Sequence, residues 1–127
     1  MPAIVDTSIL IKHQKGDAKI KRELQSVFER YPATPFITFI SMFEFLMGIK
    51  LWTKNKTEAI DFLKNFNVIN TTEETAEIMV SLKSKYDKQG KIFSLSDLII
   101  ASLTIENDMV LITSDKDFEK IEELKRK

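Results

Sequence analysis

The chain has 127 residues, 43% of them hydrophobic, so it is long enough to bury one substantial core and is expected to form a single domain over residues 1–127. Nineteen basic residues balance nineteen acidic ones, so the net charge indicates neither a nucleic-acid nor a membrane partner. The absence of cysteine excludes disulfide scaffolds and thiolate metal sites, and without a signal-peptide pattern or an apolar run of membrane-spanning length we expect a cytoplasmic protein.

Short apolar runs alternate with amphipathic stretches along the whole chain. The predicted strands are residues 3–5, 36–39, 67–69 and 109–112. The predicted helices cover residues 8–13, 17–30, 41–52, 56–65, 72–88 and 95–106, with a last one from residue 115. Strands that alternate with helices need crossover connections, which favour a parallel sheet covered on both faces. The sequence therefore predicts an α/β fold, a three-layer α/β/α sandwich with a short central parallel sheet.

Four acidic residues fall where a strand ends or a helix begins, and they are Asp6, Glu44, Asp97 and Asp115. Chain segments leave the carboxyl ends of parallel strands at one edge, so Asp6 and Asp115 face each other if the first and last strands are neighbours. Two carboxylates about 4 Å apart repel by roughly 4 kcal/mol at an effective dielectric near 20, so such a group needs a counter-charge. Oxygen ligands suit Mg²⁺ or Mn²⁺. The four acids are therefore predicted to bind this metal and to be the catalytic residues.

Each acid also has an ordinary structural explanation. Ser41 and Glu44 fit a capping box, in which the glutamate bonds the amide of the cap residue. Asp6 suits the cap of the helix that follows it, and Asp97 and Asp115 sit where acids complement a helix dipole. Capping does not account for the largely apolar sequence that follows each acid. Both explanations stay open at this point.

Hydroxyl groups flank the acids, while other catalytic machinery is missing. Thr7, Ser8 and Thr113 are suited to hydrogen bonds that orient the carboxylates, although such residues are equally common in turns. The single histidine, His13, falls at the end of a predicted helix, where an imidazole commonly complements the helix dipole. The chain has no glycine-rich phosphate loop. If it performs chemistry, the acids and a metal ion must do so.

Two further patterns concern partners. Basic residues gather in segments 12–30 and 83–91, a pattern typical of solvated helix faces and, alternatively, of a track for a phosphate backbone. The predicted helix over residues 41–52 carries more apolar residues than one buried stripe needs. We expect most of them to be buried within the domain. Met47 and Trp52 are the candidates for contact with another chain, since tryptophan is enriched at interface hot spots.

Four motifs, taken in order, resemble those of the PIN domain. They are Val5-Asp6-Thr7-Ser8, Glu44 in a helix after the second strand, the segment from Ser96 to Ala101, and the segment from Leu111 to Phe118. Their order and the small size of the chain are similar to the VapC ribonuclease toxins of prokaryotic toxin–antitoxin pairs. The resemblance spans essentially the whole chain and implies a PIN-like fold with the activity of a Mg²⁺- or Mn²⁺-dependent endoribonuclease that cuts RNA.

The resemblance also implies roles for particular residues and partners. Asp6, Glu44, Asp97 and Asp115 match the family's metal ligands. Thr7 or Ser8, together with Thr113, match its hydroxyl residues, and Asp117 matches an aspartate that supports the last loop. The partners implied are RNA as the substrate, a second copy of the chain in a homodimer, and a VapB-type antitoxin that wraps a hydrophobic groove near the active site.

Two other functions remain open from the sequence. One is a PIN-like module that binds RNA or a protein without cutting; retention of all four acids argues against it. The other is a phosphoryl-transfer receiver or phosphatase on a similar sheet. Such proteins usually carry paired acids directly after the first strand, whereas Asp6 is followed by Thr7 and Ser8.

Overall fold

A computed structural model describes residues 1–52 and 56–126, apart from the side chain of Trp52. Within these residues, five parallel strands form one sheet in the order β3–β2–β1–β4–β5. The strands are β1 (Ala3–Val5), β2 (Phe36–Thr38), β3 (Asn67–Ile69), β4 (Val110–Ile112) and β5 (Lys125–Arg126). The helices are α1 (Thr7–Gln14), α2 (Ala18–Arg30), α3 (Phe39–Trp52), α4 (Lys56–Leu63), α5 (Glu73–Asp87), α6 (Leu95–Glu106) and the 3-10 helix η1 (Lys116–Lys120).

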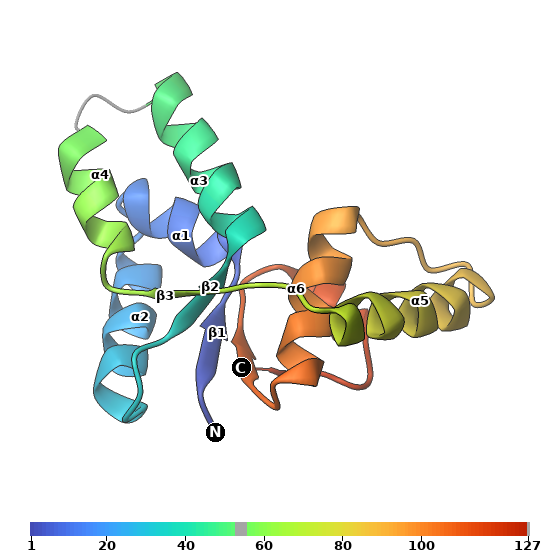
Figure 1. The fold of residues 1–127 in the computed structure, drawn as a ribbon. Helices are drawn as coiled ribbons and strands as arrows, with labels where there is room; N and C mark the ends of the chain where they lie inside the picture. Colours follow the sequence, from blue (N-terminus) through green and yellow to red (C-terminus); the bar gives the residue numbers. More distant parts are fainter. Residues whose placement is uncertain (53–55, 127) are drawn as a thin grey trace.

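Helices α1 to α4 lie on one side of the sheet and α5 and α6 on the other (Figure 1). Successive side chains of a strand point to opposite faces of the sheet, so each central strand contributes residues to a core on each face. In β1, Ala3 and Val5 belong to the core beneath α1 to α4, whereas Ile4 belongs to the core beneath α5 and α6. In β4, Ile112 and Leu111 divide in the same way. The predicted three-layer α/β/α sandwich with a short parallel sheet is confirmed.

Strands β1 and β4 are parallel neighbours, and Val5 is paired with Ile112. The pairing continues one residue further, because the amide of Asp6 donates to the carbonyl of Ile112 at 3.1 Å. From this pair, β2 and β3 extend the sheet in one direction and β5 in the other. The carboxyl ends of β1 and β4 therefore form the topological switch point, where open α/β sheets bind their ligands. The adjacency on which the predicted site depends is confirmed.

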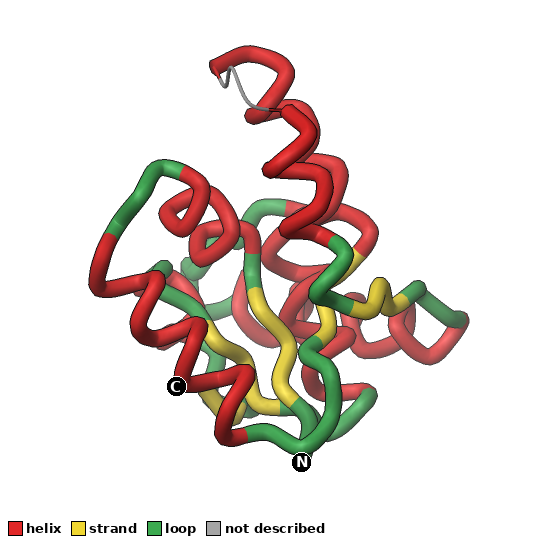
Figure 2. Tube along the Cα trace, turned by 90° about the vertical axis from the view of Figure 1, so that its left-hand side faces the viewer, coloured by secondary structure: helices red, strands yellow, loops and turns green. Residues whose placement is uncertain are grey.

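Helix α3 begins two residues earlier than predicted. Thr38, the last residue of β2, accepts a hydrogen bond from the Ser41 amide at 3.0 Å and so caps the helix. Helices α3 and α4 then project together beyond the edge of the sheet (Figures 1 and 2). In the part of the chain that the structure describes, no helix is both long enough and apolar enough to cross a membrane.

The apolar residues of α3 correct a second expectation. Among those with described side chains, Phe45 and Ile49 are buried in the domain. Ile40 and Met42 are half-buried against the two cores, and the exposed ones are Phe39, Phe43, Leu46, Met47 and Leu51. The expectation that the domain would bury most of the apolar residues of this helix is wrong, because in the described part of the chain no other helix packs over the outer face of the projecting α3–α4 pair (Figure 2). The predicted contact of Trp52 concerns a side chain outside the described residues.

The C-terminal segment also differs from the prediction. In place of the α-helix predicted from residue 115, the chain forms the five-residue 3-10 helix η1 and then the edge strand β5. Phe118, Ile121 and Leu124 recur every third residue and are all buried in the α5–α6 core. A spacing of three matches the 3-10 turn better than the α-helix, so a continuous α-helix would carry this stripe away from the core.

Candidate metal centre

Three carboxylates converge at the switch point, and they belong to Asp97, Asp115 and Asp117. One oxygen atom from each lies within 4.8 Å of the other two. Asp97 comes from the first turn of α6, which is capped by Ser94, while Asp115 caps η1 and accepts the Asp117 amide at 2.9 Å. Asp97 and Asp115 are two of the predicted ligands. Asp117, predicted only to support the loop, lies in the same cluster.

Asp6 lies beside this cluster and is almost completely buried, with 2% of its surface exposed. Its carboxylate accepts hydrogen bonds from Ser8 Oγ at 2.7 Å and from Thr113 Oγ1 at 2.6 Å, and it caps α1 through the Ile9 amide. Burial raises the pKa of Asp6, the hydrogen bonds oppose that rise, and the charge of Asp115 adds to it. Asp6 therefore caps a helix and faces the acidic cluster at the same time.

The charges of the acids act on one another most clearly at Asp97. Burial, followed by the charge of Asp115, raises the pKa of Asp97 to about 6. Ser94 opposes the rise through a hydrogen bond, while Asp6 and Asp117 add to it. Like charges at short range disfavour the ionised form, so the cluster is costly to keep charged. A cation among these oxygens would relieve that cost.

Glu44 is held close by but lies outside the group of three converging carboxylates. Its Oε1 accepts hydrogen bonds from Thr7 Oγ1 at 2.8 Å and from Ser96 Oγ at 3.0 Å. Thr7 follows Asp6 and Ser96 precedes Asp97 in the chain, so both donors come from the neighbours of other predicted ligands. The capping box expected from Ser41 and Glu44 is wrong, because the Ser41 amide donates to Thr38 instead. The role of Glu44 as a ligand stays a prediction.

A chain of buried hydroxyl groups leads from the end of β2 to Glu44. The Oγ1 of Thr38 lies 3.1 Å from the Oγ of Ser41, which lies 2.9 Å from the Oγ1 of Thr7. Each hydroxyl carries one proton, so when Thr7 donates to Glu44, Ser41 donates to Thr7 and Thr38 donates to Ser41. Thr38 and Ser41 are completely buried. Thr38, Ser41 and Ser96 are not among the predicted site residues, although polar residues within the apolar segment 36–51 are a signal for the first two.

The chemistry of the donors fits a hard divalent cation. Carboxylate oxygens are the ligands preferred by Mg²⁺ and Mn²⁺, and the converging donors are all of this kind. His13 takes no part, since its ring stacks on Phe62 at 4.2 Å between ring centroids. Burial lowers the pKa of His13, and the charge of Lys21 lowers it further. The site is thus an acidic, oxygen-only one.

A parallel α/β/α sandwich with acids gathered at its switch point defines an α/β domain with a candidate oxygen-donor metal site. The chain belongs to the PIN domain family, whose family model matches residues 3–124. It is 30% identical over 104 residues to Ribonuclease VapC3 of Methanocaldococcus jannaschii, an alignment that covers 81% of this chain and 98% of that protein.

Solved structures agree with this assignment. A toxin–antitoxin complex from Klebsiella pneumoniae contains a chain that is 28% identical, with a TM-score of 0.79, and the match covers 96% of this chain and 94% of that one. VapBC-1 from nontypeable Haemophilus influenzae is 25% identical, with a TM-score of 0.82, and the match covers 100% and 97% of the two chains. The predicted family and fold are confirmed, and family membership decides against a phosphoryl-transfer receiver.

Proposed function

We propose that the protein is a Mg²⁺- or Mn²⁺-dependent endoribonuclease that acts as the toxin of a VapBC-type toxin–antitoxin pair. The observation that carries the proposal is the convergence of Asp97, Asp115 and Asp117, with Asp6 in electrostatic contact, at the ends of β1 and β4. The named ribonuclease among its relatives supports the choice of RNA. With no cysteine in the chain, the cytoplasm is the proposed compartment.

In this proposal Asp6, Glu44, Asp97 and Asp115 hold the metal, and Asp117 contributes directly or through water. A bound divalent ion would activate a water molecule and stabilise the charge that develops on a phosphodiester. The protein's own contribution is orientation. Ser8 and Thr113 fix Asp6, while Thr7 and Ser96 fix Glu44, so both carboxylates are held in place before the substrate arrives.

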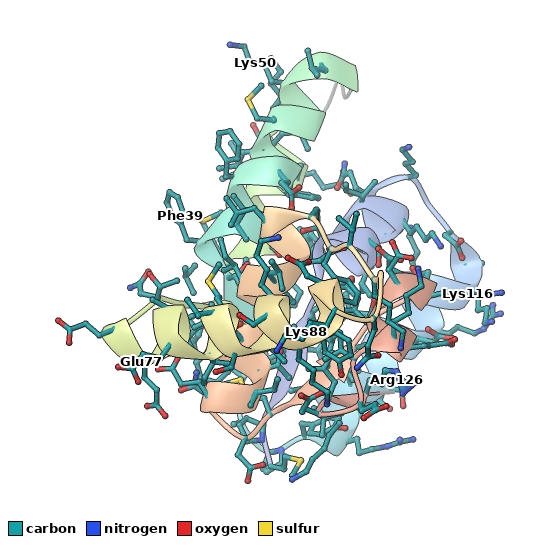
Figure 3. All side chains as sticks on the ribbon, turned by 90° about the vertical axis from the view of Figure 1, so that its right-hand side faces the viewer. Phe39, Lys50, Glu77, Lys88, Lys116 and Arg126 are labelled. Atoms are coloured by element: carbon teal, nitrogen blue, oxygen red, sulfur yellow. The ribbon has the colours of Figure 1, made fainter. Side chains whose placement is uncertain are left out.

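We also propose two protein partners. An antitoxin of the VapB type is supported by the toxin–antitoxin complexes among the solved relatives. A second copy of the chain is supported by the exposed face of α3, where apolar residues recur at helical spacing at positions 39, 43, 46, 47 and 51. Figure 3 shows Phe39 at the base of this face, pointing away from the ribbon, and it is 59% exposed. Met47 lies on the face, as its predicted partner contact requires.

Incubation of the purified protein with end-labelled single-stranded RNA tests the activity. Mn²⁺ should support cleavage and EDTA should abolish it. Asp97→Asn should lower the cleavage rate at least about 100-fold, since it removes a ligand from the cluster. Asp61→Asn is the matched control, because Asp61 is an exposed residue of α4 that forms a surface ion pair with Lys64 at 3.0 Å. RNA binding without any metal-dependent cleavage would point instead to the silent binding module.

A further inference from the structure

A groove begins at the acidic cluster and runs along α2. Its first part is a cleft of about 510 Å³ between α1, α2 and the C-terminal segment, bordered by Thr113, Ser114 and Asp115. Four cationic side chains line this cleft, and they are Lys12, Lys19, Lys116 and Arg126. Figure 3 shows Lys116 and Arg126 on the same side of the molecule, next to α2. The basic segment 12–30 therefore contributes to a concave surface beside the predicted metal ligands.

These cations are available to a ligand. Among the described residues, no ion pair within 4.0 Å joins Lys12, Lys116 or Arg126 to an acid. Lys19 forms a long ion pair with Glu23, with 4.0 Å between the nitrogen and the oxygen. Exposed pairs of this kind contribute about 0–1 kcal/mol and are easily exchanged for another anion.

The second basic segment, 83–91, differs in this respect. Lys83 pairs with Asp87 at 3.1 Å, and Lys85 pairs with Glu123 at 3.2 Å and so ties α5 to the C-terminal segment. The two basic segments look alike in the sequence, but Lys83 and Lys85 of the second segment are paired with acids at 3.1 and 3.2 Å. The first segment lines the cleft that also contains Asp115.

The groove continues past the cleft as a second pocket of about 360 Å³, which shares Glu23 and Thr113 with it. The second pocket adds Arg30 and the ring of Tyr31 above the apolar side chains of Val27 and Ile112. Once Asp115 is assigned to the metal, five cations face three acids along the two pockets, and these acids are Asp17, Glu23 and Glu119. Asp17 is engaged as the cap of α2 through the Ile20 amide at 3.1 Å.

We propose that this groove binds the sugar–phosphate backbone of single-stranded RNA on one side of the bond that is cut, with Tyr31 stacking on a base. The inference rests on the proposed function and extends it to a substrate subsite. Cations that track a backbone, joined to an aromatic side chain, are the combination that holds single strands without reading their sequence. Arg126 can bind a phosphate through two parallel hydrogen bonds.

Binding of a fluorescent single-stranded oligoribonucleotide tests the groove without any cleavage. The measurement uses the Asp97→Asn protein and follows the dissociation constant against salt concentration. Each phosphate contact to a single strand contributes about 0.7 to the slope of log Kd against log salt, so Lys116→Gln with Arg126→Gln should reduce the slope by about 1.4. Lys83→Gln with Lys88→Gln is the matched control, since it removes the same charge from the C-terminal end of α5 and from the cap residue that follows it, and should leave the slope unchanged.

Two further measurements separate this inference from the proposed function. In the wild-type background, the Lys116→Gln/Arg126→Gln protein should show a raised KM with an unchanged kcat, and Tyr31→Leu should weaken oligonucleotide binding about tenfold while keeping an apolar side chain in the core. Equal slopes and equal KM values for the groove and control variants would overturn the groove alone. A slope difference between the groove and control variants, together with a wild-type protein that cuts no RNA in Mn²⁺, would support the groove and overturn the endoribonuclease. Loss of binding to an antitoxin with RNA binding intact would make the groove a protein site and overturn the inference.

Discussion

The Ser96 hydroxyl donates a hydrogen bond to Oε1 of Glu44 at 3.0 Å and thereby joins the first turn of α6 to α3 at the edge of the acidic site. Thr7 donates to the same oxygen at 2.8 Å. Since both donors use Oε1, the other oxygen, Oε2, has no hydrogen-bond donor among the described residues. Oε2 is therefore the oxygen that we expect to face a metal ion.

Removal of the Ser96 hydroxyl should weaken metal binding. Without this donor Thr7 alone among the described residues holds the Glu44 carboxylate, at 2.8 Å, and loss of a hydrogen bond behind a ligand typically lowers metal affinity about 10–100-fold. Isothermal titration of Ser96→Ala with Mn²⁺ measures the change, and Ser96→Thr should restore most of the affinity. Ser84→Ala, at an exposed position of α5, is the control. An unchanged Mn²⁺ dissociation constant in Ser96→Ala would show that Glu44 does not contact the ion.

Thr38→Val should destabilise the fold even though it preserves the shape of the side chain. The buried Thr38 hydroxyl accepts the Ser41 amide and lies 3.1 Å from the Ser41 hydroxyl. Valine therefore leaves the Ser41 amide without its acceptor, while the Ser41 hydroxyl keeps only its contact with Thr7 at 2.9 Å. A buried polar group left unsatisfied costs about 1–3 kcal/mol. Urea unfolding should show this loss in the free energy of unfolding. Thr38→Ser keeps the hydroxyl and should lose less; equal losses in the two variants would mean that packing, not hydrogen bonding, decides the cost.

Stability without metal should fall as the pH rises through the titration of Asp97. Its pKa in the folded protein is about 6, above the ordinary value of 3.8, so the folded state binds this proton more tightly than the unfolded state does. The tighter binding of this proton therefore adds most to the free energy of unfolding below about pH 4. Its contribution declines up to about pH 6 and is absent at neutral pH. Asp97→Asn should remove the decline. Because solvent screens the charge of this half-exposed group, the Asp97→Asn substitution should raise the free energy of unfolding at pH 7 by only about 1 kcal/mol.

Thermal melting in EDTA at several pH values measures this effect. The wild-type melting temperature should drop between pH 4 and pH 6 relative to that of Asp97→Asn, whereas Asp87→Asn, which breaks an exposed ion pair with Lys83, should follow the wild-type profile. Parallel profiles for wild type and Asp97→Asn would mean that neither burial nor the neighbouring acids disfavour the ionised form of Asp97 in the folded state.

Much of the fold can be predicted from the sequence because each element carries a local signal. The apolar runs that form β1 and β4 are short and bounded by turns, and the helices show their amphipathic spacing. The C-terminal segment misleads because its apolar residues, Phe118, Ile121 and Leu124, fit a helix start after Asp115 almost as well as a 3-10 turn. The exposure of α3 depends on what packs around it, which no periodicity within the helix reveals.

The candidate site also has a part that the sequence predicts and a part that it does not. Asp6, Asp97 and Asp115 are predictable because each stands at the boundary of a recognisable element. The contacts of Glu44 are not, since Thr7 and Ser96 lie 37 and 52 residues away along the chain. Asp117 joins the cluster only because η1 is a tight turn that brings it back toward Asp115. Side chains that are brought together only by tertiary packing produce no recognisable pattern in the local sequence.

Asp117 should contribute to metal binding. Its carboxylate lies within 4.8 Å of those of Asp97 and Asp115, although Lys120 also contacts it at 3.2 Å. Asp117→Asn removes one negative charge from the cluster and should weaken Mn²⁺ binding about tenfold, as measured by the Mn²⁺-induced rise in melting temperature. Glu119→Gln, on the same 3-10 helix but outside the cluster, should bind Mn²⁺ as the wild type does. Equal Mn²⁺ affinity in the two variants would restrict Asp117 to support of the loop.

A charge placed on the exposed face of α3 should dissociate the proposed homodimer. Phe43 is an exposed apolar residue near the middle of the face, and burying a charge there without a partner costs several kcal/mol. Sedimentation velocity should show Phe43→Lys as a monomer at concentrations where the wild type is dimeric. Val80→Lys is the control, because it places the same charge on the exposed side of α5. A Phe43→Lys protein that still sediments as a dimer would place the interface elsewhere and leave the α3 face to the antitoxin.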